Sequence, residues 1–535
     1  MLPSRLGSLP AALIVLLAAA CGPPAGEREG AEPVQLIVLI SVDQFPVYLF
    51  QRYDSLYSGG LRRLLEEGRS YTNAVHDHAL TWTSAGHATL STGVAPARHG
   101  VVANSWYEEV EGEWKRVGSV DDEGESIPGV PDKRGISPRN LRVSGLADWI
   151  VATDPQSRIV SISGKRTASV LLAGRTRAGH VYYFEDDVGR FVSSTYYRDP
   201  HPHPEWLERF NDEVLAGFFA DSVWECTVPL GRRALARRDN APYENYGANT
   251  SFPHRFAAEA AAGGDPEAYY DWWDHTPELD RATLALAREA VSSLSLGTRG
   301  HVDYLAIGLS QLDRVGHDFG PLSLEQLDAL LRLDRQLAGF LAFLDDAVGK
   351  DRYVVALTSD HGVVEIPDYR RELGEPGKHI AAREIRAVHQ TAIEADQAAG
   401  SPADRRSAVI RALKELDFIA DVMTLEQLVG PESSDSFVAL YQRSYYPGRV
   451  PGVLAKQGLV VRLTEGSHGG PEMTTHGSPY LYDRHVPLIF MGPGIRAGSS
   501  SDAVHTTDVA PTLARLAGIS FPAGLDGRPL IEETD

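Results

Sequence analysis

Aspartate and histidine side chains recur where short apolar runs of the sequence begin or end. The six candidates are Asp43, Asp313, His317, Asp360, His361 and His476. Carboxylate oxygens and imidazole nitrogens together are the ligand mixture that suits zinc. Asp313 and His317 are four residues apart and can face one metal ion from a helix. The six ligands divide into two three-ligand sites, each with an open coordination position, as catalytic zinc requires.

Each of these residues alone is weak evidence for a metal. An Asp-His-Gly sequence such as Asp360–Gly362 is often only a turn, and a lone histidine such as His317 can cap a helix. The conjunction is harder to explain in this way, because three aspartates and three histidines all stand at the ends of predicted elements. Most of them also have glycine or proline beside them. The sequence therefore predicts a metal centre.

The apolar runs predict the strands that position this centre. Residues Leu36–Val42 form a nearly unbroken apolar run, which is typical of a strand buried on both faces of a parallel sheet. Similar runs occur at 159–162, 303–308, 353–357 and 486–491, with helical patterns at 55–67, 279–294 and 324–348 between them. This alternation predicts an α/β fold, a doubly wound and mostly parallel sheet flanked by helices. Ligands of such sheets bind at the carboxyl ends of the strands, where three of the four clusters lie.

The composition excludes one class of partner. The 535 residues include 51 Lys and Arg against 72 Asp and Glu, a formal net charge of −21. Because a phosphate backbone attracts basic surfaces, this acidic excess argues against a nucleic-acid partner. Metal ions in the site would still permit an anionic substrate. The two cysteines are Cys21 and Cys226, so removal or lipidation of Cys21 leaves no intramolecular disulfide.

The order of the motifs resembles that of the alkaline phosphatase superfamily. The matching segments are Val42–Gln44, Thr81–His87, Gly93–Tyr107, Phe191–Tyr197, Asp313–His317, Asp360–Gly362, His476–Pro479 and Tyr482–Leu488. More narrowly, the chain resembles the bacterial phosphate-irrepressible alkaline phosphatases that use threonine as nucleophile. The resemblance extends from about residue 34 to 530 and is weakest at 380–450. It implies a phosphohydrolase with two Zn²⁺ ions.

The resemblance assigns the six ligands to two zinc ions. One ion would be held by Asp313, His317 and His476, and the other by Asp43, Asp360 and His361. The second ion would lie next to the nucleophile. The substrates would be phosphate monoesters of small molecules, and inorganic phosphate would be released.

The resemblance also implies roles for three further residues. Thr83 would be the nucleophile that forms a phosphothreonine intermediate, because metal coordination lowers the pKa of an alcohol enough to activate it. Asn104 would hydrogen-bond a phosphoryl oxygen, and Lys165 would place its ammonium against the transferred phosphoryl group. Without the surrounding motif, Thr83 would be interpreted as a helix cap or a strand hydroxyl.

One position departs from the family pattern. Relatives that hydrolyse monoesters often have arginine two residues after the lysine, whereas this chain has Thr167 there and Arg166 one residue early. In an extended segment Arg166 would point the opposite way. A monoester carries more negative charge than a diester, so losing a guanidinium penalises monoesters more. Because Lys165 remains, monoesterase is the first prediction, and a phosphodiesterase or nucleotide pyrophosphatase of the same superfamily is the alternative.

Two other classes of protein fit less well. A sulfatase would need cysteine or serine inside a Cys/Ser-x-Pro-x-Arg motif, and the segment Thr83–Ala85 offers none. A non-catalytic metal- or glycan-binding lipoprotein would need neither Thr83 nor Lys165. Metal-dependent turnover of an aryl phosphate separates this last class from an enzyme.

The ends of the chain predict its location. The predicted parts are a signal peptide with a lipobox at 1–21, a tether at 22–33, and a catalytic domain at 34–530 with insertions at about 180–280 and 366–455. The apolar stretch Leu9–Ala20 is too short to span a bilayer but is typical of a signal peptide. Three alanines precede Cys21, which predicts a lipid anchor there, although ordinary cleavage nearby is the alternative. We therefore expect a periplasmic or cell-surface protein that contacts the membrane only through this anchor.

Overall fold

The structure described here is a computed structural model. It describes residues 33–531, apart from gaps at 132, 198–202, 219–222, 256–265, 399, 453 and 455–456. The predicted signal peptide and nearly all of the predicted tether lie outside the described residues. None of the helices within the described part has the length and apolar character that a membrane crossing needs.

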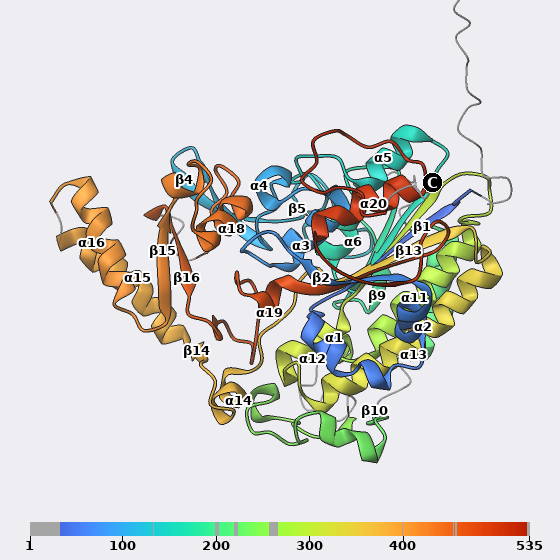
Figure 1. Cartoon of the computed structure of the whole chain (residues 1–535), viewed down its shortest axis with the longest axis horizontal. Coiled ribbons are helices and arrows are strands. Elements are labelled where there is room, and N and C mark those ends of the chain that lie inside the picture. The colour runs from blue at the N-terminus through green and yellow to red at the C-terminus, as the bar shows by residue number, and fades with distance from the viewer. Residues whose placement is uncertain are drawn as a thin grey trace, which may run out of the picture. The chain divides into compact units, whose positions relative to one another are not determined.

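A central sheet of nine strands organises the fold (Figure 1). In spatial order the strands are β19 (Gly498–His505), β2 (Arg69–Val75), β18 (His485–Met491), β13 (Tyr353–Thr358), β1 (Leu36–Val42), β12 (Asp303–Leu309), β7 (Ile159–Ser163), β8 (His180–Glu185) and β9 (Arg190–Val192). The strands from β13 to β8 are mutually parallel, whereas β18 and β9 pair antiparallel with their inner neighbours. The predicted doubly wound, mostly parallel sheet is confirmed.

Helices cover both faces of this sheet (Figure 1). One face carries α2 (Gly60–Glu67), α11 (Glu278–Ser293) and α13 (Leu324–Ala347), and the other carries α5 (Leu146–Thr153), α6 (Arg166–Leu172) and α20 (Val509–Leu516). Strand β1 shows why, because its alternate side chains enter two different hydrophobic cores. Val38 and Ile40 pack into the first core, and Ile37 and Leu39 pack into the second. Both faces of the strand are therefore buried, as its apolar run predicts.

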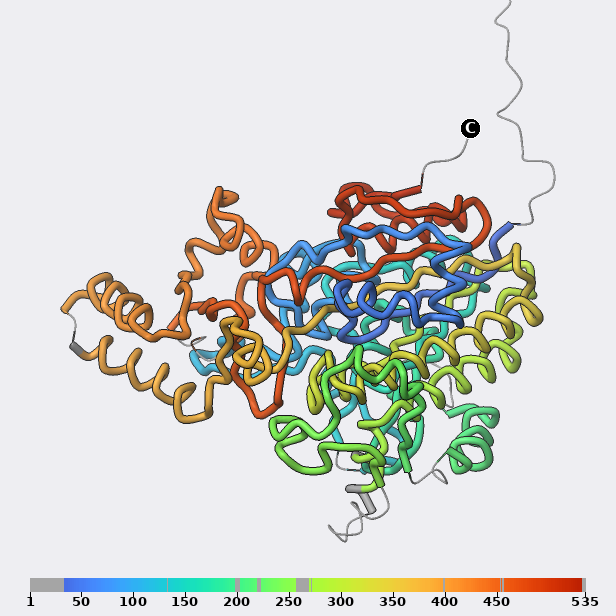
Figure 2. The backbone as a smooth tube through the Cα atoms, turned by 60° about the horizontal axis from the view of Figure 1, so that its bottom comes forward, coloured from blue at the N-terminus to red at the C-terminus, as the bar shows by residue number. Residues whose placement is uncertain are grey.

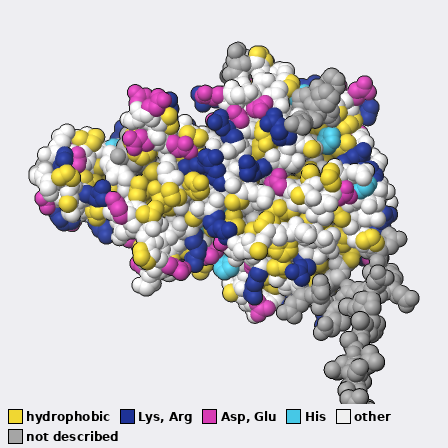
Figure 3. Space-filling view, turned by 90° about the horizontal axis from the view of Figure 1, so that it is seen from above, with side chains coloured by type: hydrophobic (Ala, Val, Ile, Leu, Met, Phe, Trp, Pro, Cys, Tyr) yellow, Lys and Arg dark blue, Asp and Glu magenta, His cyan; other side chains and the backbone are white. Residues whose placement is uncertain are grey.

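The two predicted insertions differ in their relation to this sheet. The segment 180–280 begins within it, because β8 and β9 are its last two strands. The segment 366–455 contains α15 (Ala382–Ala398), α16 (Pro402–Lys414) and β15 (Ile419–Thr424), which form a lobe outside the central sheet, and β15 pairs with β16 (Leu459–Leu463). Helices α15 and α16 lie side by side in Figure 2 and share a small core with the β15–β16 pair. Hydrophobic side chains gather on one face of this lobe, beside Lys and Arg side chains (Figure 3). The boundaries of both insertions stay predictions.

Candidate active site

The six predicted metal ligands come together at one edge of the sheet. Asp43 directly follows β1, and Asp360 and His361 follow its neighbour β13. Asp313 lies on α12 (Gln311–Phe319), the helix that begins where β12 ends. Because β12, β1 and β13 are adjacent and parallel, their carboxyl ends deliver these residues to one place.

His476 reaches the same edge by a different route. It precedes β18 in the sequence, in the loop before α19 (Leu481–Arg484). Strand β18 runs antiparallel to β13, so its beginning lies at the edge where the parallel strands end. The antiparallel direction explains why His476 precedes its strand in the sequence, whereas the other candidate ligands follow theirs.

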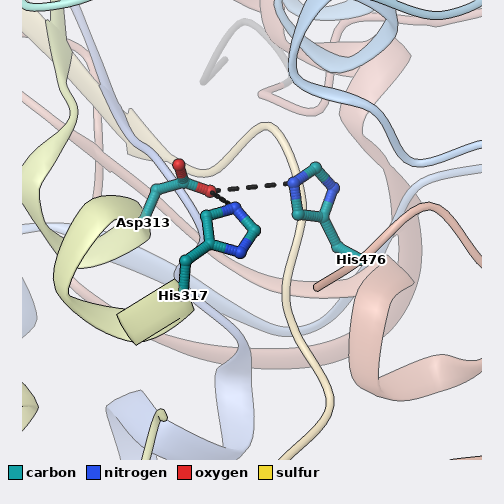
Figure 4. Close-up of side chains that lie close together, drawn as sticks. All are labelled: Asp313, His317 and His476. Carbon is teal, nitrogen blue, oxygen red and sulfur yellow. Dashed lines mark ion pairs between the residues drawn. The ribbon is translucent and has the colours of Figure 1, made fainter. Parts of the chain in front are cut away.

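Asp313, His317 and His476 form the first group of ligand atoms (Figure 4). Nε2 of His317 lies 3.2 Å from Oδ1 of Asp313, and Nε2 of His476 lies 3.7 Å from the same oxygen. The first two residues are one turn apart on α12, and His476 approaches from the opposite side (Figure 4). The three ligand atoms lie within 4.8 Å of one another, which is close enough for one metal ion.

His361 is surrounded by the remaining carboxylates. Its Nε2 lies 3.2 Å from Oδ2 of Asp360, 3.7 Å from Oδ1 of Asp43 and 4.0 Å from Oδ1 of Asp313. Two further sets of three residues have ligand atoms within 4.8 Å of one another. One set is Asp43, Asp313 and His361, and the other is Asp43, His87 and Asp360. The two predicted ligand sets are thus brought into one continuous cluster, with Asp313 and His361 adjoining both halves.

Backbone hydrogen bonds fix the tautomers of the histidines. Nδ1 of His317 lies 2.7 Å from the carbonyl oxygen of Thr474, and Nδ1 of His476 lies 2.7 Å from that of Thr81. Nδ1 of His361 lies 3.0 Å from the carbonyl oxygen of Gly362. A neutral imidazole that donates from Nδ1 presents the lone pair of Nε2, which is the arrangement that metal ligands adopt. All three Nε2 atoms face the cluster.

This arrangement of acceptors fits a cation. Burial lowers the pKa of His476 to about 4, and burial together with the neighbouring His476 ring lowers the pKa of His361 well below its usual range. The two rings are therefore neutral, and they stack with their centroids 3.4 Å apart. Oδ1 of Asp43 is buried and receives no hydrogen bond from the described residues. Acceptors that face one another in a dry site are costly unless positive charge lies between them, so the residues present fit a metal centre.

Thr83 lies beside this cluster at the first position of α3 (Thr83–Thr92). Its Oγ1 lies 3.3 Å from Nε2 of His361, so the hydroxyl adjoins the ligand atoms directly. The whole of α3 is buried, and Gly86 lets it pack closely, because a Cβ at that position would lie 2.1 Å from the carbonyl oxygen of Asp360. This close approach places the threonine next to the strand end that carries the ligands.

Asn104 and Lys165 line the same pocket of about 370 Å³ as Thr83. The backbone N–H of Ser84 donates to Oδ1 of Asn104 at 2.9 Å, which directs the amide nitrogen of Asn104 elsewhere. Nζ of Lys165 lies 2.7 Å from Oδ2 of Asp43 and also contacts Asp313. Although burial opposes its charge, these carboxylates raise the pKa of Lys165, so the ammonium stays charged.

The segment after Lys165 is helical from Arg166 onward, and the extended conformation considered above is not adopted. Lys165 directly precedes the first residue of α6, and its side chain makes no capping hydrogen bond there. Thr167 lines the pocket that contains Thr83, whereas Arg166 turns away, and its guanidinium lies 3.7 Å from Asp121. The structure therefore places a neutral hydroxyl in the pocket at the position where relatives often have arginine.

Two positioning residues lie in the motifs but carry no predicted role. His87 is one turn from Thr83 on α3, and its Nδ1 lies 2.8 Å from the carbonyl oxygen of Thr83 and 3.3 Å from Oδ2 of Asp360. Gln44 adopts the left-handed φ of 58° and is buried. Its amide donates to the carbonyl oxygen of Asp313 at 3.1 Å, and its N–H donates to Oδ1 of Asp360 at 3.3 Å. A non-glycine residue in this region is strained, and such strain persists where the surroundings fix it.

The comparison with protein families decides the affiliation of the chain. Residues 37–462 match the model of the type I phosphodiesterase / nucleotide pyrophosphatase family. The chain belongs to this family. Alkaline phosphatase PafA of Elizabethkingia meningoseptica is 31% identical over 93% of this chain and 94% of its own length. Alkaline phosphatase PhoK of Sphingomonas sp is 32% identical over 94% of this chain and 91% of its own length.

Solved structures of the family agree with this. The crystal structure of PafA matches with a TM-score of 0.83 and 29% identity, and the match covers 93% of this chain and 98% of that one. A PafA variant substituted at a threonine, an asparagine, a lysine and an arginine matches equally well. Its threonine and asparagine are as far apart in sequence as Thr83 and Asn104, and its arginine follows its lysine as Thr167 follows Lys165. The chain is a phosphoric ester hydrolase with an alkaline phosphatase fold and candidate metal-binding groups.

Proposed function

We propose that the protein is an exported alkaline phosphatase that binds two zinc ions and hydrolyses phosphate monoesters through a phosphothreonine intermediate. The observation that carries the proposal is the position of Thr83. Its hydroxyl lies 3.3 Å from Nε2 of His361, an atom whose other neighbours are the carboxylates of Asp43, Asp313 and Asp360. A nucleophile beside a metal-ligand cluster is the arrangement that acyl- or phosphoryl-transfer chemistry at a metal requires.

The cluster would hold the two ions with the ligand sets that the sequence predicts. Asp313, His317 and His476 would bind one, and Asp43, Asp360 and His361 the other. Bound zinc would lower the pKa of the threonine hydroxyl and offset negative charge on the phosphoryl oxygens.

The proposed hydrolysis has two steps. In the first step, the hydroxyl of Thr83 gives up its proton and Oγ1 forms a bond to phosphorus, while the bond from phosphorus to the leaving oxygen breaks and that oxygen takes up a proton to become the alcohol. In the second step, water replaces the threonine oxygen, which restores the hydroxyl and releases inorganic phosphate. The backbone N–H groups that begin α3 favour the negative charge at this position. Asn104 would donate from its amide nitrogen to a phosphoryl oxygen, because its oxygen already accepts from Ser84.

Replacing Lys165 tests whether the site prefers monoesters. Lys165→Ala is expected to lower kcat/KM for an aryl phosphate monoester by about 10- to 150-fold, the value of one charge-assisted hydrogen bond. The matching diester should lose less, because its second substituent replaces one charged oxygen. The measurement is the ratio of kcat/KM for the two esters, with Thr167→Arg as a variant expected to raise it. Equal losses on both esters, or none on either, would contradict a discriminating role for Lys165.

A phosphodiesterase is the second candidate function, and one observation favours it. Thr167 gives the pocket a neutral side chain where a guanidinium would assist a dianionic substrate. The family description also names a phosphodiesterase. A wild-type enzyme with the higher kcat/KM for the diester would favour this candidate over the monoesterase.

We further propose that the mature chain is periplasmic or at the cell surface, bound to the membrane through a lipid on Cys21. The support is the sequence, since residues 1–32 lie outside the described part. Its substrates would be small phosphate esters, with no nucleic-acid partner. Cys21→Ser is expected to move the protein from the membrane fraction to the soluble fraction, as seen by immunoblotting. An unchanged distribution would show that the residue carries no anchor.

A further inference from the structure

We propose that Arg314 supplies the phosphoryl group of a monoester substrate with the positive charge that Thr167 cannot supply. This inference rests on the proposed monoesterase function and adds a specificity-determining residue to it. Arg314 belongs to none of the roles that the motifs predict, because it is simply the residue after Asp313.

The position of Arg314 brings it into the catalytic pocket. It lies on α12 between the ligands Asp313 and His317, and its side chain lines the same pocket as Thr83 and Thr167. Residues three apart are neighbours on the surface of a helix, so Arg314 lies beside His317. Its side chain keeps 32% of its surface exposed, which leaves it accessible to a small substrate.

A buried carboxylate anchors this arginine. Nη2 of Arg314 lies 2.7 Å from Oδ2 of Asp274, whose side chain is 4% exposed. The next residue, His275, bonds to the same helix one turn further on, with its Nδ1 2.6 Å from Oδ2 of Asp318. Asp274, the last residue of α10 (Pro266–Asp274), and His275 directly after it therefore bind Arg314 and Asp318 of α12. An anchored guanidinium loses little conformational entropy when it binds an anion.

The charges of the pocket explain why this arginine is needed. Among the described residues that line the pocket, Lys165 and Arg314 are the only lysine and arginine. The ammonium of Lys165 is shared with the carboxylates of Asp43 and Asp313, which offset part of its charge, and the pocket wall also contains Glu472. A phosphate dianion would therefore meet few cationic partners from the chain. The planar guanidinium of Arg314 can donate to two phosphoryl oxygens together, which a threonine cannot do.

The test compares two esters in the zinc-loaded enzyme. Arg314→Ala is expected to lower kcat/KM about 10- to 150-fold for 4-nitrophenyl phosphate and only about threefold for methyl 4-nitrophenyl phosphate. The inhibition constant of inorganic phosphate should rise together with the monoester loss, since phosphate presents the same oxygens. Arg314→Lys keeps the positive charge but not the planar, two-donor guanidinium. Its kcat/KM for the monoester should fall less than in Arg314→Ala, and the monoester should again lose more than the diester. The lysine variant also serves if the alanine variant does not fold.

A rescue and a matched control sharpen the result. In the Arg314→Ala background, Thr167→Arg is expected to restore part of the monoester rate, because residue 167 lines the same pocket. Arg166→Ala removes a neighbouring cation that pairs with Asp121 and does not line this pocket, so both esters should keep wild-type rates. Asp274→Asn removes the anchor and should give a smaller loss that again favours the diester.

Two results would overturn the inference. Equal losses on both esters, with phosphate inhibition unchanged and no rescue by Thr167→Arg, would assign Arg314 a structural role in holding Asp274. Wild-type rates in Arg314→Ala would show that it has no role in turnover. A wild-type enzyme without monoesterase activity would instead contradict the proposed function, so the two failures are distinguishable.

Discussion

Thr83→Ala is expected to lower kcat/KM for a phosphate monoester by roughly 10³- to 10⁶-fold, the range seen when a catalytic nucleophile is removed. The physical reason is that the proposed route passes through an ester on Oγ1, and alanine has no oxygen to form it. Thr83 is buried at the start of α3, so a methyl group fits there without disturbing the helix. The loss should therefore appear in turnover, while the melting temperature stays close to that of the wild type.

The matched variant is Thr83→Ser, which supplies the same alcohol without the methyl group. It should retain substantial activity, and the phosphorylated residue should be detectable by mass spectrometry after an acid quench. A Thr83→Ala enzyme with near wild-type kcat/KM would show that water attacks phosphorus directly. The metal-site proposal would survive that result, but the covalent intermediate would not.

Chelation of the metal is expected to abolish turnover and to destabilise the fold. The side chains of Asp43, Asp313 and Asp360 are at most 3% exposed, so without metal ions three buried carboxyl groups share a dry site in which the ammonium of Lys165 contacts two of them. Ligand that binds only the folded state stabilises it by about 2.7 kcal/mol at a concentration 100 times its Kd. Zinc added to the chelated protein should therefore restore activity and raise Tm together, with about two ions per chain by elemental analysis.

A ligand variant separates the metal effect from general destabilisation. His361→Ala should lower kcat/KM by roughly 10³-fold or more, because metals contribute several kcal/mol to the stabilisation of the transition state. His301→Ala is the control, since His301 also pairs with an aspartate, Asp154 at 2.7 Å, but precedes β12 at the opposite edge of the sheet. It should leave turnover unchanged. Full activity in a thoroughly demetallated sample would contradict the metal assignment.

The sequence was sufficient to predict that the candidate ligands lie together, because strand ends leave a local signal. Asp43 and Asp360 each follow an apolar run that both faces of the sheet bury, and a parallel sheet collects such ends at one edge. The predicted fold was confirmed for the same reason. The position of His476 needed one further fact, the antiparallel direction of β18, which depends on pairing across the sheet rather than on any local pattern.

Other features of the site depend on contacts that are distant in sequence. Arg314 has no motif of its own, and its anchor Asp274 lies forty residues earlier on another helix. The direction of Arg166 could not be inferred either, because periodicity near Lys165 does not show whether the segment is extended or helical. Helix α6 starts at Arg166, so its helical turn, rather than the alternation of an extended segment, directs Arg166 away from the pocket that Thr167 lines.

The place of β18 in the sheet also affects how the protein is made. This strand lies between β13 and β2, although it is among the last parts of the chain to be synthesised. His476 likewise bonds to Thr81, a partner 395 residues earlier. Contacts this far apart close late and fold slowly, and until then the edges of β13 and β2 are unpaired and prone to aggregate. A nascent chain that ends before residue 476 therefore lacks a predicted metal ligand together with strands β18 and β19, and we expect it to hydrolyse no ester until translation is almost finished.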